Sequence, residues 1–189
     1  MKKNTIYSFM ILITLLLATA FIPRGQSKSF GLDPQRVRLR RIYTAEIGVR
    51  EKTGKNDGPR VAEYLRYTQL GEGYAWCAAF VSWVFGRAGY DQPRTPWTPA
   101  LFPAKRVIWK QGRTQGNHKP PRAGDVFGIW FNTLGRVAHT GMIDQWKDGY
   151  AITVEGNTNT NGSNDGDGVY RKRRPIRSLY VVADWVEGH

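Results

Sequence analysis

The chain has 189 residues, 41% of them hydrophobic, and a formal net charge of +13. We expect one domain with a sizeable core and no second module of similar size. The charge favours polyanionic partners. A single cysteine, Cys77, excludes an internal disulfide, so its thiol is unpaired, intermolecular or chemically used.

The first twenty residues have the layout of an export signal. Lys2 and Lys3 precede an apolar run from Ile6 to Leu17, and small residues follow at 18–20. We interpret residues 1–20 as a signal peptide, or as an uncleaved N-terminal anchor, because the apolar stretch is only slightly shorter than the about 20 residues of a spanning helix. We therefore expect export to the periplasm, the cell envelope or the medium, with membrane contact only through this segment. Export makes anionic envelope polymers, and not nucleic acid, the expected polyanion.

Residues 21–32 are rich in Gly, Ser, Lys and Pro and predict a linker, and residues 33–189 predict one domain. Asp33 and Pro34 are typical of a helix start, and this helix carries Val37, Ile42 and Ala45 near its apolar face. A second short helix ends before Gly71. Further helices are predicted from about Trp76 to Ala88 and from Thr98 to Gly112.

The third helix has one apolar stripe at the i, i+3, i+4, i+7 spacing of a buried face. The stripe comprises Cys77, Phe80, Val81, Val84, Phe85 and Ala88.

After Pro120 the pattern changes to short β-type runs separated by Gly, Asn and Asp. Helices followed by strands predict an α+β domain with an antiparallel sheet. The runs are Val126–Phe131, Val137–Asp144, Tyr150–Val154, Val169–Arg173 and Leu179–Trp185.

Two basic runs, Arg36–Arg41 and Arg171–Arg174, account for much of the charge. Such runs are usually solvated faces, and the alternative here is a role in holding the protein on an anionic wall.

Cys77 lies in the first turn of the third predicted helix. Free N–H groups and the positive end of the helix dipole favour a thiolate there. The same N–H groups can hold an oxyanion. A helix N-terminus thus supplies two requirements of a cysteine nucleophile.

A thiol nucleophile also needs a base, and the chain has three histidines. His189 is the last residue, and His118 lies in a polar stretch that predicts a loop. His139 opens an apolar run at the end of a predicted strand. A lone histidine there is usually structural, but its pairing with the single cysteine favours catalysis.

Glu155 and Asn157 come two residues apart at the end of the next strand, so both side chains leave one face. If the two strands pair antiparallel, that face also carries His139. Glu155 then orients the imidazole. Asn157 shares that task, donates near the oxyanion, or is only the turn residue that starts a loop.

Five segments together, in this order and spacing, resemble a CHAP-domain cysteine amidohydrolase/peptidase, a relative of the NlpC/P60 hydrolases in the papain-like group. The resemblance extends over roughly residues 33–185. The segments are Ile47–Glu51 (IGVRE), Tyr74–Trp83 (YAWCAAFVSW), Gly124–Val126 (GDV), His139–Gly141 (HTG) and Glu155–Asn157 (EGN).

The resemblance implies a papain-like fold in which the cysteine helix packs on an antiparallel sheet. It implies that Cys77 is the nucleophile, His139 the base, Glu155 the orienting acid and Asn157 a fourth polar residue. The implied substrate is peptidoglycan, cut either at the N-acetylmuramoyl-L-alanine amide or at a stem or cross-bridge peptide bond. The chain departs from the family in having no clear polar oxyanion residue upstream of the cysteine, where Gln69 is the nearest candidate.

Two tryptophans, Trp76 and Trp130, are candidates for walls of a substrate groove, with burial in the core as the alternative. We expect no cofactor and no metal. The stretch that starts at Asn157 reproduces the first spacing of a calcium loop, but Gly168 stands where a bidentate Glu belongs. The main alternative function is a non-catalytic basic module that binds the cell wall on the same fold. A nucleic-acid binder is supported only by the charge.

Overall fold

The computed structural model describes residues 33–160 and 166–187. The expected signal or anchor segment and the linker, residues 1–32, lie outside the described residues. The described helices are α1 (Pro34–Ala45), α2 (Pro59–Tyr67) and α3 (Cys77–Arg87), with short 3₁₀ helices η1 (Thr98–Leu101), η2 (Ala104–Arg106), η3 (Asn132–Leu134) and η4 (Ile176–Ser178). None of the helices in these ranges combines the length and the apolarity needed to cross a membrane.

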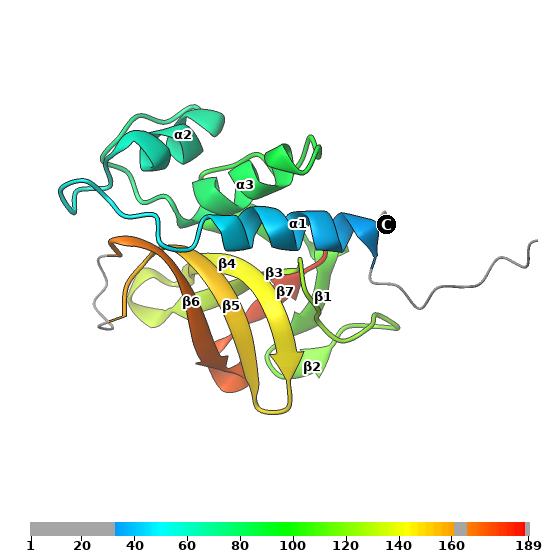
Figure 1. Cartoon of the computed structure of the whole chain (residues 1–189). Coiled ribbons are helices and arrows are strands. Elements are labelled where there is room, and N and C mark those ends of the chain that lie inside the picture. Colours follow the sequence, from blue (N-terminus) through cyan, green and yellow to red (C-terminus); the bar gives the residue numbers. More distant parts are fainter. Residues whose placement is uncertain (1–32, 161–165, 188–189) are drawn as a thin grey trace, which may run out of the picture. The chain divides into compact units, whose positions relative to one another are not determined.

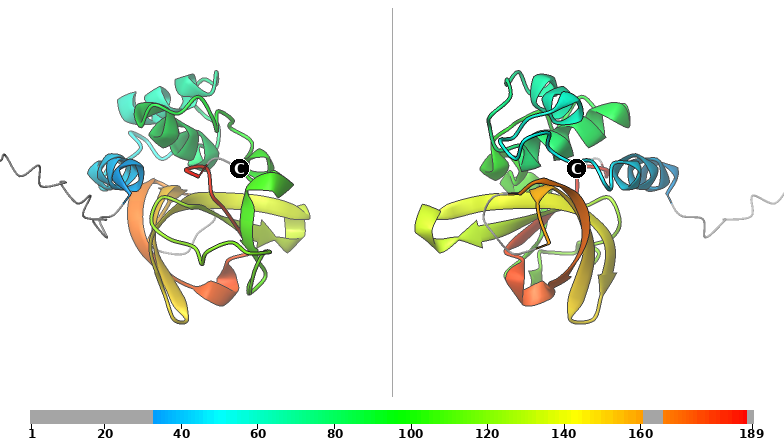
Figure 2. Two further views of the ribbon diagram at one scale, coloured as in Figure 1. Left: turned by 90° about the vertical axis from the view of Figure 1, so that its right-hand side faces the viewer. Right: turned by 60° about the vertical axis from the view of Figure 1, so that its left-hand side comes forward.

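The strands form one seven-stranded sheet with the order β2-β1-β7-β3-β4-β5-β6, and every pairing is antiparallel. The helices gather on one side of the sheet (Figure 1), which is strongly curved in both views of Figure 2. The predicted α+β class is confirmed. The strands are β1 (Val107–Lys110), β2 (Arg113–Thr114), β3 (Val126–Phe131), β4 (Arg136–Lys147), β5 (Tyr150–Thr158), β6 (Gly168–Pro175) and β7 (Val181–Ala183).

Helix α1 begins as predicted, because the Asp33 carboxylate accepts a hydrogen bond from the Gln35 N–H at 2.9 Å and Pro34 occupies the first turn. Of the predicted apolar face, Ile42 packs against the core, but Ala45 is exposed. The buried residues are Arg36, Leu39 and Tyr43, whereas Val37 is exposed. Arg36 faces inward because it forms ion pairs with buried carboxylates of other segments. The periodicity of apolar residues along the helix cannot predict such pairs.

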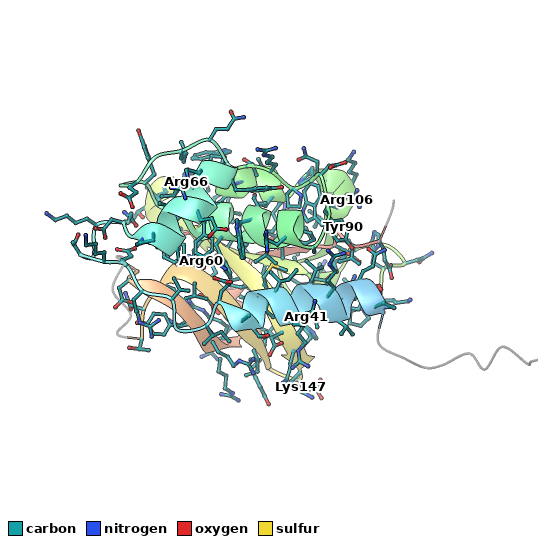
Figure 3. All side chains as sticks on the ribbon, turned by 45° about the horizontal axis from the view of Figure 1, so that its top comes forward. Arg41, Arg60, Arg66, Tyr90, Arg106 and Lys147 are labelled. Atoms are coloured by element: carbon teal, nitrogen blue, oxygen red, sulfur yellow. The ribbon has the colours of Figure 1, made fainter. Side chains whose placement is uncertain are left out.

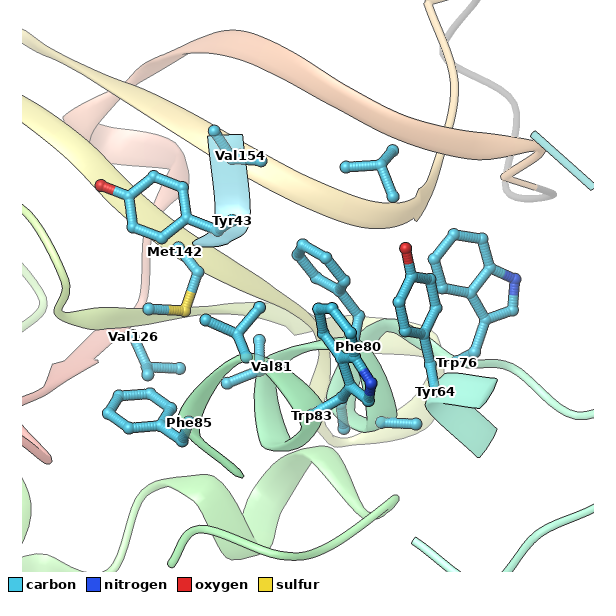
Figure 4. Packing of buried hydrophobic residues seen from close by; sticks show 14 of the residues in the cluster. Tyr43, Tyr64, Trp76, Phe80, Val81, Trp83, Phe85, Val126, Met142 and Val154 are labelled. Atoms are coloured by element: carbon cyan, nitrogen blue, oxygen red, sulfur yellow. The ribbon is translucent and has the colours of Figure 1, made fainter. Parts of the chain in front are cut away.

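Helix α3 is buried on all sides, and not along one stripe: every residue from Cys77 to Phe85 is buried. The helix lies between the sheet and the other helices, so it has no solvent face. Figure 4 shows Phe80 and Val81 of α3 between Tyr64 of α2 and the strand residues Met142 and Val154. Each such side chain contributes about 1.5–3 kcal/mol on burial, so this layer fixes the start of α3 against the sheet.

The helix predicted from Thr98 to Gly112 is wrong. The segment forms η1 and η2 and then strand β1, which pairs with β7. Pro103 lacks an N–H and stops helix growth between the two 3₁₀ turns, and the β-branched and aromatic residues that follow favour a strand. The strand predicted at 179–185 is likewise shorter, covering only β7.

Much of the positive charge is spread over separate elements. Figure 3 labels Arg41 on α1, Arg66 on α2 and Lys147 at the end of β4, all of them exposed. The two basic runs, however, are not simple solvated faces, because Arg36 and Arg174 each form ion pairs with buried carboxylates.

Candidate active site

Cys77 is the first residue of α3 and is 5% exposed. Trp76 caps the helix without a side-chain hydrogen bond. The N–H groups of the first turn have no acceptor within the helix, and the positive end of the helix dipole lies at the same end. Both favour negative charge on the Cys77 sulfur. The sequence placed Cys77 at this helix start, and the structure agrees.

The Sγ atom of Cys77 has three polar neighbours. The Thr98 Oγ1 lies 3.7 Å away, and the His139 ring and the Ala78 N–H hydrogen-bond to the sulfur. Burial alone would raise the pKa of the thiol, but the hydrogen bond and positive charge of His139 outweigh it. The pKa of Cys77 is therefore lowered, which favours a thiolate.

His139 lies on β4 and is 12% exposed. Its Nε2 is 2.8 Å from the Glu155 Oε2 on the neighbouring strand β5, which leaves Nδ1 for the Cys77 sulfur. Burial would lower the pKa of His139, but the hydrogen bonds and charges of Cys77 and Glu155 raise it to about 9. These two shifts favour an imidazolium beside a thiolate.

Glu155 is fully buried and accepts four hydrogen bonds. Besides His139, Arg174 of β6 binds both carboxylate oxygens, with Nε–Oε1 at 2.9 Å and Nη2–Oε2 at 2.6 Å, and the Thr153 hydroxyl donates to Oε1 at 2.5 Å. Burial would raise the pKa of Glu155, but Arg174 and then His139 hold it far below its usual value. Glu155 is thus a fixed anion behind the imidazole.

Glycines let these strands approach closely. A Cβ at Gly141, in the HTG segment, would lie 3.0 Å from the Glu155 Cγ and 2.8 Å from the Val154 oxygen. A Cβ at Gly156, in the EGN segment, would lie 2.6 Å from the Trp76 ring. Each motif therefore combines a polar residue with a glycine, whose missing side chain leaves room for an adjacent residue.

A comparison with family models matches the CHAP domain to residues 69–157, a range that contains Cys77, His139 and Glu155. The chain is a CHAP-domain protein. No curated protein and no solved structure matched the chain. CHAP domains are generally hydrolases that act on peptidoglycan, so the family-level function is of the peptidoglycan hydrolase type.

Asn157 of the CHAP domain lies apart from the thiol and the imidazole in its contacts. Its Oδ1 accepts the Trp76 N–H at 3.1 Å, and its Nδ2 donates to the Asn56 Oδ1 at 3.0 Å. Its backbone is left-handed, with φ of 53°, so it leaves the regular strand alternation on which the prediction of a shared face depended. Asn157 therefore anchors the residue before Cys77, in place of orienting His139.

The two groove tryptophans lie elsewhere. Trp76 is fully buried, stacks on Tyr64 with 5.5 Å between ring centroids, and donates its Nε1–H to Glu51 at 2.8 Å. Its ring thus belongs to the core and offers no surface to a substrate. Trp130 is exposed but packs on Tyr180, in a cavity that Cys77 does not line. Gln69 is exposed after α2, and Thr98 is the polar side chain that faces the sulfur instead.

Sequence reasoning missed Arg174, Thr98 and the aromatic side chains beside Cys77. The cavity over the thiol, of about 290 Å³, has Tyr74 and Trp97 in its wall. A signal for Arg174 was present: β6 follows the acid strand, and Arg174 pairs with Ala151, which shares a strand face with Thr153 and Glu155. Thr98 stands before a proline and was interpreted as a helix cap. Its position beside the Cys77 sulfur was therefore not predicted.

Within residues 33–160 and 166–187, no three His, Cys, Asp or Glu side chains are grouped as metal ligands. Gly168, which took the acidic position in the calcium-loop register, opens strand β6, and residues 161–165 lie outside the described residues.

Proposed function

We propose that this CHAP-domain protein is a cysteine amidohydrolase/peptidase that cleaves an amide bond in peptidoglycan through a thioester on Cys77. The observation that carries the proposal is the chain of contacts from the Cys77 thiol, which lines a cavity, through His139 to the buried Glu155. A wall-binding module needs none of these groups in contact, whereas a nucleophile needs all three.

The first half of the reaction forms the thioester. The Cys77 thiolate attacks the carbonyl carbon of the amide, and the carbonyl oxygen becomes an oxyanion near the free N–H groups that begin α3. The His139 imidazolium then gives its proton to the amine as the C–N bond breaks. Because the pKa of His139 is raised to about 9, this proton is in place before the substrate binds.

The second half releases the acid. Neutral His139 takes a proton from water, whose oxygen attacks the thioester carbon, and the C–S bond breaks to regenerate the thiolate. Glu155 keeps the ring orientation and compensates the imidazolium charge in both halves. The scheme requires no cofactor.

The proposed substrate bond is the N-acetylmuramoyl-L-alanine amide or a stem or cross-bridge peptide bond, and the proposed place of action is the envelope, reached through export by residues 1–20. The net charge of +13 supports retention on anionic envelope polymers.

The test is to incubate purified peptidoglycan with the protein, with Cys77→Ala and with His139→Ala, and to identify new ends by mass spectrometry. We expect free amino groups from the wild type alone, and the fragment masses assign the bond. His118→Ala, a histidine in the 115–120 loop, is the matched control and is expected to cleave normally. Binding by all variants without cleavage by any would replace the enzyme with the non-catalytic wall-binding module.

A further inference from the structure

The cavity over Cys77 carries one formal charge. Its wall includes Tyr74 and Trp97, which are 59% and 52% exposed, and otherwise uncharged residues apart from Arg136. Large exposed rings beside a nucleophile are unusual in a surface that only contacts water. A substrate that reaches the Cys77 sulfur therefore meets aromatic surface and a single guanidinium group.

Arg136 is held in place without using most of its hydrogen-bonding capacity. Its guanidinium carbon lies 4.3 Å from the Trp97 ring centroid, and Nη1 donates to the Val137 carbonyl oxygen at 3.2 Å. Stacking occupies the flat face of the group, whereas its five N–H donors project from the edge. Within residues 33–160 and 166–187, four of these donors have no partner, and a stacked side chain loses little conformational entropy when a ligand binds.

Arg136 also lacks a carboxylate. In the described part of the chain, the arginines of the ion pairs are 36, 40, 60, 122, 171 and 174, and no pair involves Arg136. Each of these six arginines pairs with at least one buried carboxylate inside the domain. Several other described arginines also have no ion pair, and Arg136 is the one among them that lines the cavity over Cys77.

The register of β3 and β4 aims Arg136 at the reacting groups. Phe131 of β3 pairs with Arg136 of β4, and Ile129 pairs with His139. The two pairs are two residues apart on β3 but three residues apart on β4. The extra residue, Ala138, is a β-bulge, and it also lines the cavity over Cys77. Residues paired across an antiparallel ladder share a face, so the bulge brings Arg136 onto the face of His139.

Arg136 lies between two cavities. On its other side it lines a second one, of about 520 Å³, together with Trp130, Val137 and Tyr180. A chain-like substrate laid across Cys77 therefore continues past the guanidinium group into a further, largely apolar space. This position suits an anchor that sets the register of a peptide relative to the scissile amide.

We propose that Arg136 binds a free carboxylate of the substrate peptide and thereby selects acidic wall peptides over their amidated forms. The inference rests on the proposed function, because it assigns a subsite of the same groove. The ligand is a carboxylate because the planar fork of Arg136 matches its two oxygens, and an amide offers one acceptor and a repelling NH₂.

The test uses two synthetic cell-wall peptides that are identical except for one carboxylate or carboxamide next to the scissile bond. We expect the wild type to cleave the carboxylate peptide with a kcat/KM about tenfold to a hundredfold higher, mainly through KM. Arg136→Leu is expected to bring the ratio close to one, and Arg136→Lys to retain part of it because the charge stays but the fork is lost. Arg41→Leu removes one exposed charge on α1 and is expected to keep the full ratio.

The Cys77→Ala protein supplies a second measurement that does not depend on turnover. Calorimetry is expected to show tighter binding of the carboxylate peptide to Cys77→Ala and equal binding of both peptides to Cys77→Ala with Arg136→Leu. Equal cleavage of the two peptides by the wild type, or a ratio that survives Arg136→Leu, would overturn the role of Arg136 alone. No cleavage of either peptide or of whole peptidoglycan would remove the proposed function, and the subsite with it.

Discussion

Arg36 and Arg174 each turn inward from a basic run. Arg36 meets two buried carboxylates and Arg174 meets one, and the two clusters differ in their remaining members. Arg36 binds Asp125 at 2.7 Å and Asp184 at 2.6 Å, and so ties α1 to residues beside β3 and β7. Arg174 binds both oxygens of Glu155, whose second partner is His139. The first cluster contains only a guanidinium group and carboxylates, and burial raises the pKa of Asp125 to about 7. The second cluster ends at a histidine that gains and loses a proton beside a thiol.

The difference separates an arginine that stabilises the fold from one that supports the candidate active site. Arg36 is buried with its partners, so its loss removes the cation that Asp125 and Asp184 share and leaves Asp184 with Arg122, at 3.7 Å. Arg174 is 24% exposed, and its loss still leaves Glu155 with the imidazolium and with Thr153. We therefore expect substitutions of Arg36 to lower mainly the free energy of unfolding, and substitutions of Arg174 to lower mainly kcat.

The largest effect is expected from the anion of the second cluster. Glu155→Gln removes the charge that stabilises the imidazolium, so kcat should fall by about 10²–10⁴-fold while KM changes little. The measurement is steady-state hydrolysis of a cell-wall peptide, with Asp148→Asn in the exposed β4–β5 turn as the control. Unchanged turnover would take Glu155 out of the site.

Breaking the first cluster should act on folding. Arg36→Met leaves Asp125 and Asp184 buried without their shared cation, and the free energy of unfolding should fall by about 3–5 kcal/mol. Urea unfolding measures this change, and kcat per folded molecule should equal that of the wild type. A selective loss of kcat with normal stability would reverse the assignment of the two clusters.

A smaller effect is expected at the far end of the second cluster. Arg174→Met removes two charge-assisted hydrogen bonds from Glu155, and kcat should fall by about tenfold to a hundredfold, with a smaller loss of stability than in Arg36→Met. Arg174→Lys should recover part of the rate. Arg173→Met, the exposed neighbour on β6, is the matched control, and an equal loss of rate there would mean that only the charge of the run matters.

The smallest effect on rate is expected from pH near neutrality. Because the pKa of His139 is raised to about 9, the imidazolium stays protonated, and kcat/KM should be nearly flat from pH 7 to 8 and fall above about 9. Glu155→Gln removes a neighbouring anion, which lowers the pKa of His139 and should move the alkaline limb to lower pH. An alkaline limb that stays in place in this variant would show that Glu155 does not set the charge of His139.

Parts of this site were readable from local pattern and chemistry. The spacing of apolar residues after Trp76 predicted the helix that begins at Cys77, and short β-type runs between turn residues predicted the strands of His139 and Glu155. The five short segments added the family, which the match to residues 69–157 bears out. These features are encoded within a few residues of one another, so the sequence displays them directly.

The errors have one cause, which is contact between distant segments. Trp76 and Trp130 look alike in sequence, yet the first is stacked under α2 and the second is exposed on β3. Asn157 bonds to the Trp76 N–H because its left-handed backbone takes it out of the strand alternation that the prediction assumed. Pro103 and the partner strand β7 decided against a fourth long helix.

The sequence by itself determined the residues of the candidate site: one thiol at a helix start, one histidine and one acid on successive strands. Only the tertiary structure decided which arginine of each basic run turns inward, because that choice depends on partners 148 residues away for Arg36 and 19 for Arg174. It likewise decided that a bulge at Ala138 carries Arg136 to the face of His139. The periodicity of a sequence predicts which face of its own helix or strand a side chain lies on. The register between paired strands determines which residues it contacts there.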